Sequence, residues 1–373
     1  MNPAHGGLGV LPGHPFAPLP RWAAALVLAL LAAVMAWSAV ASAPKPEAPR
    51  APSAASPAAA PAPSDRAKGD MALYARISAR VTAGEGYYAA ALDEQRASNY
   101  PTAPFVVVRL PTLAWLQALI GVNGVRWLAL AVVACGLWAL NRRAGPLGTL
   151  AERLAASLLL VLGGGAALSP VAGLDHDFVA GLLLTLALLL YRPERWWPAL
   201  LAAGAALAVR ELAAPFVLLW LAFALAGRRW REAGALAAVL AVFAIGIGLH
   251  YASVEAGRLP GDLASQGWNA RAGFALPLAA LGQLTGLRFL PPGLAAPLAI
   301  LPLVGWAALG GRLGLFAVLW FAGLAAMMAL FARPANFYWV ELGLPAYALG
   351  LAFAPRGLIA LFRSAFGRVA RQT

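Results

Sequence analysis

The chain has 373 residues, of which 61% are hydrophobic and only 12% are charged, about half the charged fraction of an average soluble protein. Its formal net charge is +13. The arginines stand at the ends of apolar runs and form no single basic face, which argues against nucleic acid as a partner and is typical of the positive-inside pattern of membrane proteins. The one cysteine, Cys135, excludes an intrachain disulfide.

Residues 1–20 are rich in Gly and Pro and are predicted to be a disordered cytoplasmic segment. The apolar run 22–41 follows and is long enough to span a bilayer. Its end, Ala41-Ser42-Ala43, resembles a signal-peptide cleavage site, but Pro44 directly after it disfavours cleavage. We therefore expect a retained membrane anchor.

Residues 44–123 are predicted to form a long first extracytoplasmic loop. The loop opens with a Pro/Ala linker over 44–63, whose composition favours an extended, solvated chain. Residues 64–100 are amphipathic but too polar to span, which predicts one or two short interfacial helices and then a turn at Tyr100-Pro101. The run 105–121 is broken by Arg109 and Pro111 and fits an interfacial or re-entrant helix.

The rest of the chain predicts nine further spans, so the fold class is an all-α polytopic membrane protein with about ten transmembrane helices. Several spans end in arginine, which places both termini in the cytoplasm and residues 356–373 in a basic cytoplasmic tail. We expect a transmembrane domain over 21–355, located in the inner membrane of a bacterium. The nine spans cover about 124–140, 154–172, 177–191, 196–209, 213–227, 232–251, 293–311, 313–332 and 337–354.

Ionisable groups at a membrane boundary are costly, and each is a functional candidate. In the stretch "GDMALYARISAR", Asp70 and Tyr74 share one helical face, and Arg76 lies on an adjacent one. The alternative for Asp70 is a helix N-cap.

The triplet Asp175-His176-Asp177 opens a span on the same predicted side. Its carboxylates can hold a divalent cation such as Mg²⁺ or Mn²⁺, or bind a polar substrate. The alternative is helix capping with acids at a helix N-terminus, and the residues alone do not decide between the two.

Two further groups are candidates. The pair Arg210-Glu211 either forms an interfacial turn or places a guanidinium on an anionic phosphate. The last hairpin carries Arg333, Asn336 and Tyr338, for which interfacial anchoring is the alternative. All four groups, together with Arg109, map to one predicted membrane face, a convergence that suits a phosphate-bearing substrate and a base or metal centre.

The stretches "GDMALYARISARV", "NYPTAPFVVVRLPTLAWL", "LDHDFVAGLLLTLALLL" and "LAVRELAAPFVLL" with "RRW" resemble the GT-C superfamily of membrane glycosyltransferases, the polyprenyl-phosphate-sugar-dependent enzymes that include the aminoarabinose and mannose transferases. The resemblance covers about residues 20–355 and is architectural more than motif-exact. The His-Pro-Pro of some members is here Tyr100-Pro101-Thr102-Ala103-Pro104.

That resemblance implies transfer of a sugar from a polyprenyl-phosphate donor to a lipid or glycan acceptor at the extracytoplasmic face, with inversion. Asp70 would act as the catalytic base or position the acceptor. Asp175 and Asp177 would form a second acidic site, and Arg210 and Arg333 would hold the lipid-linked phosphate. We expect the other candidates to bind substrate, namely Tyr74, Arg76, Arg109, His176, Glu211, Asn336 and Tyr338. The alternatives are a transporter or flippase and a polysaccharide polymerase or ligase of the cell envelope.

Overall fold

The computed structural model describes residues 15–42, 69–144 and 148–367, which form helices joined by loops and contain no strand, only an isolated bridge between Ala103 and Ala264. The predicted linker 44–63, residues 1–14 and residues 368–373 of the basic tail lie outside the described residues. The α-helices are α1 (Arg21–Ala41), α2 (Asp70–Thr82), α3 (Tyr87–Ala97), α4 (Thr112–Ala144), α5 (Leu150–Gly164), α6 (His176–Leu190), α7 (Trp197–Val209), α8 (Ala214–Ala226), α9 (Trp230–Ala256), α10 (Ala275–Leu284), α11 (Pro292–Leu298), α12 (Leu301–Leu309), α13 (Gly311–Phe331), α14 (Leu344–Leu349) and α15 (Ala354–Phe366). The 3-10 turns are η1 (Phe105–Val107), η2 (Gly165–Leu168), η3 (Ala172–Leu174), η4 (Glu211–Ala213), η5 (Gly286–Phe289), η6 (Pro334–Leu342) and η7 (Gly350–Ala352).

The prediction of an all-α polytopic membrane protein is confirmed at the level of fold class. Among the described residues, six helices are long and apolar enough to cross a membrane, and a seventh crossing results if the pair Leu344–Ala352 and Ala354–Phe366, bent by 49°, is one span. The predicted count of about ten is not confirmed. The expected spans 177–191, 196–209 and 213–227 correspond to α6, α7 and α8, which have 13 to 15 residues and rise about 20–22 Å each, less than the roughly 30 Å of a hydrocarbon core.

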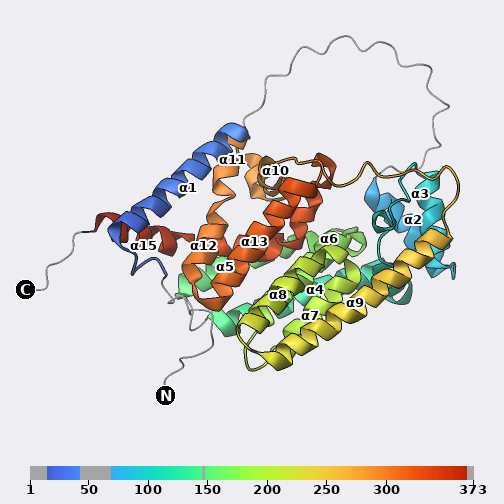
Figure 1. Cartoon of the computed structure of the whole chain (residues 1–373), viewed down its shortest axis with the longest axis horizontal. Coiled ribbons are helices and arrows are strands. Elements are labelled where there is room, and N and C mark those ends of the chain that lie inside the picture. Colours follow the sequence, from blue (N-terminus) through green and yellow to red (C-terminus); the bar gives the residue numbers. More distant parts are fainter. Residues whose placement is uncertain (1–14, 43–68, 145–147, 368–373) are drawn as a thin grey trace, which may run out of the picture.

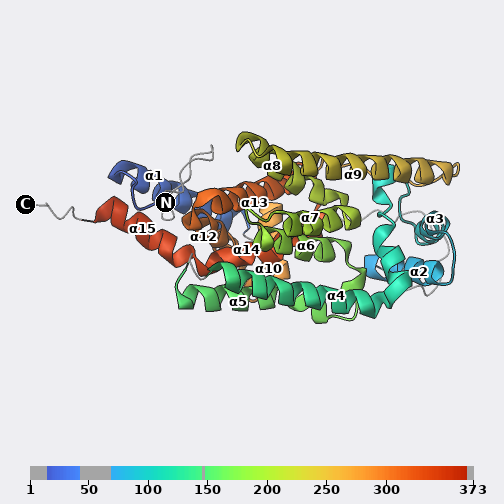
Figure 2. The same ribbon diagram turned by 90° about the horizontal axis from the view of Figure 1, so that it is seen from below.

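Of these short helices, α6 and α7 lie between the long helices α4 and α9 (Figure 2), whereas α8 lies beside α9 and exposes Leu218 by 52%. Small residues on α6 and α7 allow the close packing of this centre, since Ala180, Ala203 and Ala206 are fully buried. Gly181 of α6 meets η6 so closely that a Cβ there would lie 2.0 Å from the carbonyl oxygen of Glu341. This contact fixes η6 beside the start of α6.

The predicted interfacial segment forms two helices, α2 and α3, at one end of the molecule (Figure 1). Leu73, Ile77 and Val81 recur every four residues on α2 and are buried, as expected of one apolar helical face. Arg76 joins the two helices through an ion pair with Glu94 at 2.9 Å. This ion pair holds α2 and α3 together as one unit, which includes the N-terminal end of α2.

The predicted juxtamembrane run and the following span are joined in α4, with a break at Gly121, where φ is 75° and ψ is 160°. The positive φ suits a residue that lacks a Cβ. The segment before the break lies against α2, and the segment after it runs toward the opposite end (Figure 2).

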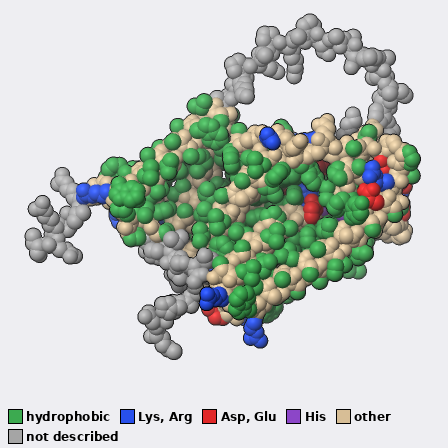
Figure 3. Space-filling model, in the orientation of Figure 1, with side chains coloured by type: hydrophobic (Ala, Val, Ile, Leu, Met, Phe, Trp, Pro, Cys, Tyr) green, Lys and Arg blue, Asp and Glu red, His purple; other side chains and the backbone are tan. Residues whose placement is uncertain are grey.

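That opposite end, here called the arginine end, consists of residues 142–144, 191–196, 227–231, 310–312 and 356–367. Figure 3 shows mainly basic side chains at its edges, with a few acidic ones beside them at the lower edge, whereas acidic side chains are more prominent at the end that carries α2 and α3. The charge segregation expected from the sequence is therefore present along the length of the molecule. The basic tail begins as the helix α15.

Candidate active site

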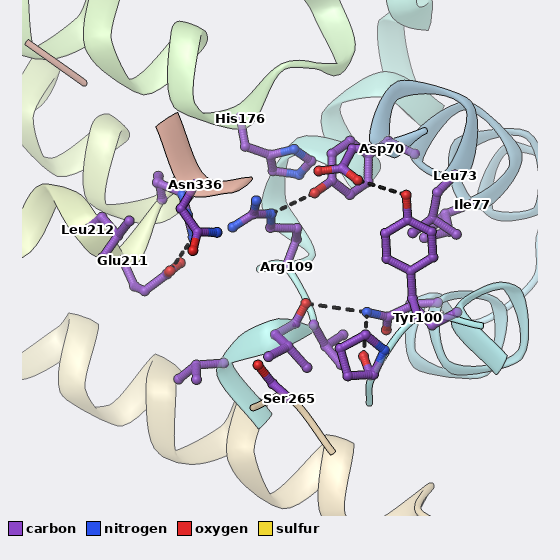
Figure 4. A pocket seen from close by; sticks show the side chains of 18 of the residues that line it. Asp70, Leu73, Ile77, Tyr100, Arg109, His176, Glu211, Leu212, Ser265 and Asn336 are labelled. Carbon is purple, nitrogen blue, oxygen red and sulfur yellow. Dashed lines mark hydrogen bonds and ion pairs between the residues drawn. The ribbon is translucent and has the colours of Figure 1, made fainter. Parts of the chain in front are cut away.

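A cavity of about 300 Å³ lies among α2, the start of α4, the start of α6, η4 and η6. It lies beside α2, toward the end of the molecule opposite the arginine end (Figure 1), and Figure 4 shows it from close by. Nine of the twelve site residues expected from the sequence line it, and they come from five separate segments. These nine are Asp70, Tyr74, Arg109, His176, Arg210, Glu211, Arg333, Asn336 and Tyr338.

Asp70 is the first residue of α2, and the N-cap position is occupied by Gly69, whose φ is 110°. The N-cap alternative for Asp70 is therefore wrong. Its carboxylate instead accepts a hydrogen bond of 2.8 Å from the hydroxyl of Tyr100. Burial and the Asp70 charge raise the pKa of Tyr100 above its usual range, so the phenol stays a donor and fixes the carboxylate at the cavity wall.

Arg109 lies between η1 and α4 and reaches the centre of the cavity, between Asp70 and Tyr100 on one side and Glu211 and Asn336 on the other (Figure 4). Its Nε donates to the hydroxyl of Tyr74 at 2.8 Å, and its Nη2 lies 3.7 Å from Asp177. The nearest carboxylate therefore makes a long contact, and the guanidinium keeps donors for a ligand.

Tyr74 packs edge-on against His176, with ring centroids 4.8 Å apart. Burial raises the pKa of Tyr74 to about 12, and the Arg109 charge opposes part of that shift. The phenol therefore accepts from Arg109 in its neutral form and keeps its own proton available to a ligand.

Arg210 forms a buried ion pair with Asp177 at 2.8 Å, with both side chains only 3% exposed, and a second pair with Glu211. The positive charge of the Arg210 guanidinium is thus balanced by the carboxylates of Asp177 and Glu211. A pair buried this deeply loses several kcal/mol if one partner is removed, because the other charge is left unpaired. Arg210 lines the cavity, but its main contacts hold Asp177 and Glu211 in place.

The Asp175 carboxylate caps α6 by accepting from the N–H of Phe178 at 3.0 Å. Asp175 therefore acts as a helix cap, as the alternative interpretation of the triplet expected. Asp177, at the other end of the expected metal-binding pair, faces Arg210. Within the described residues, no group of three or more His, Cys, Asp and Glu side chains is arranged to hold a metal ion. Because one carboxylate caps α6 and the other pairs with Arg210, the donor set does not fit the expected divalent cation.

Arg333, Asn336 and Tyr338 enter the cavity from η6. The side chain of Asn336 accepts from the backbone N–H of Arg333 at 3.2 Å and lies 3.3 Å from the Tyr338 hydroxyl. Within the part of the chain that the structure describes, Arg333 forms no ion pair. It is therefore a second guanidinium available to an anion.

The remaining expected residue, Arg76, lies outside the cavity. It donates to Glu94 and to the hydroxyl of Ser98 at 2.9 and 2.8 Å. Its role is to join α2 to α3, and it does not face the cavity.

Sequence reasoning did not single out the aromatic and amide groups that complete the wall. Tyr87 donates to the Arg109 carbonyl at 2.6 Å, and Gln95 donates to the carbonyl of Pro101 at 3.2 Å. Trp268 comes from the loop between α9 and α10 and contacts Trp339 edge-on. The available signal was aromatic residues within otherwise polar segments, and those positions meet only after folding.

Searches against protein-family models, curated proteins and solved structures found no match for this chain.

Proposed function

We propose that the chain is an integral membrane glycosyltransferase that transfers a sugar from a polyprenyl-phosphate donor to an acceptor hydroxyl at the extracytoplasmic face. One observation carries the proposal. A carboxylate, Asp70, shares one cavity with two guanidinium groups, Arg109 and Arg333, that are not fully compensated by carboxylates. This combination suits a reaction in which a hydroxyl loses a proton while a phosphate leaves.

The donor phosphate would bind between Arg109 and Arg333. Guanidinium groups form charge-assisted, bidentate hydrogen bonds with phosphate oxygens. As the bond between the sugar and the phosphate breaks, negative charge builds on the phosphate, and fixed cations in a partly buried site stabilise that charge. The polyprenyl chain would remain in the surrounding bilayer, which accounts for a transferase embedded in a membrane.

The sugar would lie against the aromatic wall. Tyr74, Tyr338 and Trp268 offer apolar ring faces, and Asn336 and Gln95 offer hydrogen-bonding amides. A cavity with apolar walls and a few placed polar groups is the usual composition of a small-ligand site.

Asp70 would act as the general base. The acceptor oxygen attacks the anomeric carbon, its proton passes to the Asp70 carboxylate, and the bond from the anomeric carbon to the phosphate oxygen breaks with its electron pair going to the phosphate. A single in-line displacement of this kind inverts the anomeric configuration. The hydrogen bond from Tyr100 holds the carboxylate in one orientation for that transfer.

The location of the polar groups favours this function over a transporter, since a transporter places its binding groups near the middle of the bundle. Here they gather around one cavity beside α2, toward the end of the helical body that carries α2 and α3. A polysaccharide polymerase or ligase would use the same bond chemistry with a glycan acceptor.

The test is release of radiolabelled sugar from a panel of polyprenyl-phosphate sugars by membranes that contain wild type or Asp70→Asn at matched expression. Asparagine still accepts from Tyr100 but cannot take a proton, so transfer should fall about 10²- to 10⁴-fold. Asp93→Asn is the matched control, because Asp93 is 56% exposed on α3 and lies outside the cavity. Full transfer by Asp70→Asn, or no donor consumed by wild type, would overturn the proposal.

A second variant tests the phosphate site with the donor identified by that panel. Arg333→Gln should raise the KM for the donor about tenfold or more, as expected for loss of a charge-assisted contact. Arg258→Gln removes an exposed arginine that pairs with Glu255 outside the cavity and should leave KM unchanged. Equal KM values for wild type and Arg333→Gln would remove Arg333 from donor binding.

A further inference from the structure

A second, more open cavity of about 1020 Å³ lies at the arginine end, far from the candidate active site. The segment before α1, the start of α5 and one side of α15 form its walls. Figure 1 shows α1 and α15 meeting at this end of the molecule. None of the residues assigned to sugar transfer lies here.

The polar lining of this cavity is mostly cationic. Arg21, Arg356 and Arg363 face one carboxylate, Glu152. The Nε of Arg356 lies 3.4 Å from Glu152, whose other oxygen accepts from the backbone N–H of Thr149 at 2.8 Å. Three positive groups against one negative group leave two charges unbalanced by the lining.

The other two arginines are the accessible ones. Arg21 donates through Nη2 to the carbonyl of Gly367 at 2.9 Å, which leaves most of its donors unused. Among the described residues, Arg363 forms no ion pair. Arg21 and Arg363 are both exposed residues.

The same helix that supplies the arginines also presents an apolar face. Ile359, Phe362 and Phe366 are 51%, 54% and 70% exposed and follow a helical spacing of three and four residues. Arg356 and Arg363 are seven residues apart and share the adjacent face, with Ile359 three residues after the first and four before the second at the boundary. A helix with exposed large apolar groups on one face and arginines on another is typical of a helix lying in the membrane interface.

Trp22, directly after Arg21 on α1, is 71% exposed. Exposed tryptophans in membrane proteins concentrate at the level of the lipid headgroups, so Trp22 indicates that level for this end of α1. The guanidinium groups of the cavity therefore lie where lipid phosphates are found. A soluble phosphate would need only the charges, whereas the apolar face beside them matches acyl chains as well.

We propose that this cavity binds the headgroup of an anionic phospholipid, with its phosphodiester between Arg21 and Arg363 and its acyl chains along the Ile359 and Phe362 side of α15. Basic pockets between helices at the membrane surface are the known setting for such binding. The bound lipid would bridge α1 and α15. This inference does not depend on the sugar-transfer proposal.

The test uses the full-length protein in nanodiscs of phosphatidylcholine, with or without phosphatidylglycerol as the anionic probe. Native mass spectrometry counts retained phosphatidylglycerol, and thermal unfolding gives Tm in the same preparations. The variant is Arg21→Gln with Arg363→Gln. The control is Arg192→Gln with Arg195→Gln, which removes equal charge from the loop between α6 and α7, outside the cavity.

Wild type and the control should retain phosphatidylglycerol and show a higher Tm when it is present. The cavity variant should bind phosphatidylglycerol about fivefold more weakly for each removed charge and should lose the Tm increase. Arg21→Lys with Arg363→Lys keeps both charges and should retain most of the binding, which separates lipid loss from misfolding. Equal lipid retention by the cavity variant and the control would overturn the proposal, and so would an equal Tm increase from inorganic phosphate in phosphatidylcholine alone.

Discussion

At the scale of the residue, the candidate site depends on a few phenols that keep their protons. Tyr100 orients Asp70, and Tyr74 accepts from Arg109. Each phenol lies in a desolvated position, where the charged form is disfavoured. The carboxylate and the guanidinium of the site are thus separated by neutral hydroxyl groups and do not neutralise each other through a direct ion pair.

The Tyr74 phenol gives a prediction about alkaline pH. Burial raises the native pKa to about 12, whereas an unfolded tyrosine titrates near 10. Between these values the unfolded chain binds fewer protons, so the free energy of unfolding falls as pH rises through this window.

Tyr74→Phe removes that contribution, and the drop in Tm from pH 9 to pH 11 should be smaller for the variant than for wild type. Thermal unfolding at the two pH values measures both drops. The remaining tyrosines titrate in both proteins, so they provide the internal reference. An identical drop in wild type and variant would contradict the assignment.

At the scale of the element, the site depends on how closely η6 approaches α6. The side chains of Arg333, Asn336 and Tyr338 all come from η6 and its start. Because Gly181 has no side chain, the backbone at Glu341 can lie against α6. A shift of η6 would move three cavity residues together.

Gly181→Ala should therefore lower both stability and donor binding. The new Cβ would meet backbone atoms 2.0 Å away, and overpacking of this kind costs about 1–3 kcal/mol. Thermal unfolding and donor KM measure the two effects. Gly323→Ala on α13 is the control, because a Cβ added there would meet no atom within 4 Å, and this variant should be at least as stable as wild type with the same donor KM. Wild-type stability in Gly181→Ala would show that η6 has room to move.

The sequence predicted the helices of the polar segment 64–100 and most residues that line the candidate cavity. The two predictions rest on different kinds of pattern. The four-residue recurrence of Leu73, Ile77 and Val81 is local, so α2 follows from it directly. The convergence of Asp70 and Arg333 followed from arginines at the other end, which is a topological argument. The pairing of Arg210 with Asp177 depends on side chains 33 positions apart, and no spacing rule predicts it.

The same limit explains the helix count. Apolar composition marks α6, α7 and α8 as strongly as it marks α9, because a helix buried among helices and a helix facing lipid are both hydrophobic. Helix length would distinguish a buried helix from a membrane-spanning one, but the sequence does not show where each helix ends. Tertiary contacts, such as those of the buried Arg210, determine these ends.

At the scale of the whole molecule, charge is segregated along the helical body, with a mixed polar cavity at one end and arginines at the other. If the positive-inside pattern applies, the arginine end faces the cytoplasm. The cavity then faces the opposite side of the membrane, where polyprenyl-linked sugars would meet their acceptors.

Cysteine labelling tests this orientation. Gln266→Cys lies in the exposed loop beside the cavity, and Glu194→Cys lies in the exposed loop between α6 and α7. Both are made in a Cys135→Ala background, because Cys135 is exposed. A membrane-impermeant maleimide added to intact bacterial cells with a permeabilised outer membrane should label the first variant and not the second. The reverse pattern would invert the orientation.

Single turnover of labelled donor by purified Asp70→Asn, with the acceptor present and the donor bound at saturation, tests the role of Asp70 as the base. We predict that the variant binds the donor as tightly as wild type and leaves the bound sugar untransferred, because the arginines bind the donor and Asp70 only removes the proton. Transfer of the bound sugar at the wild-type rate would contradict the assignment of Asp70 as the base.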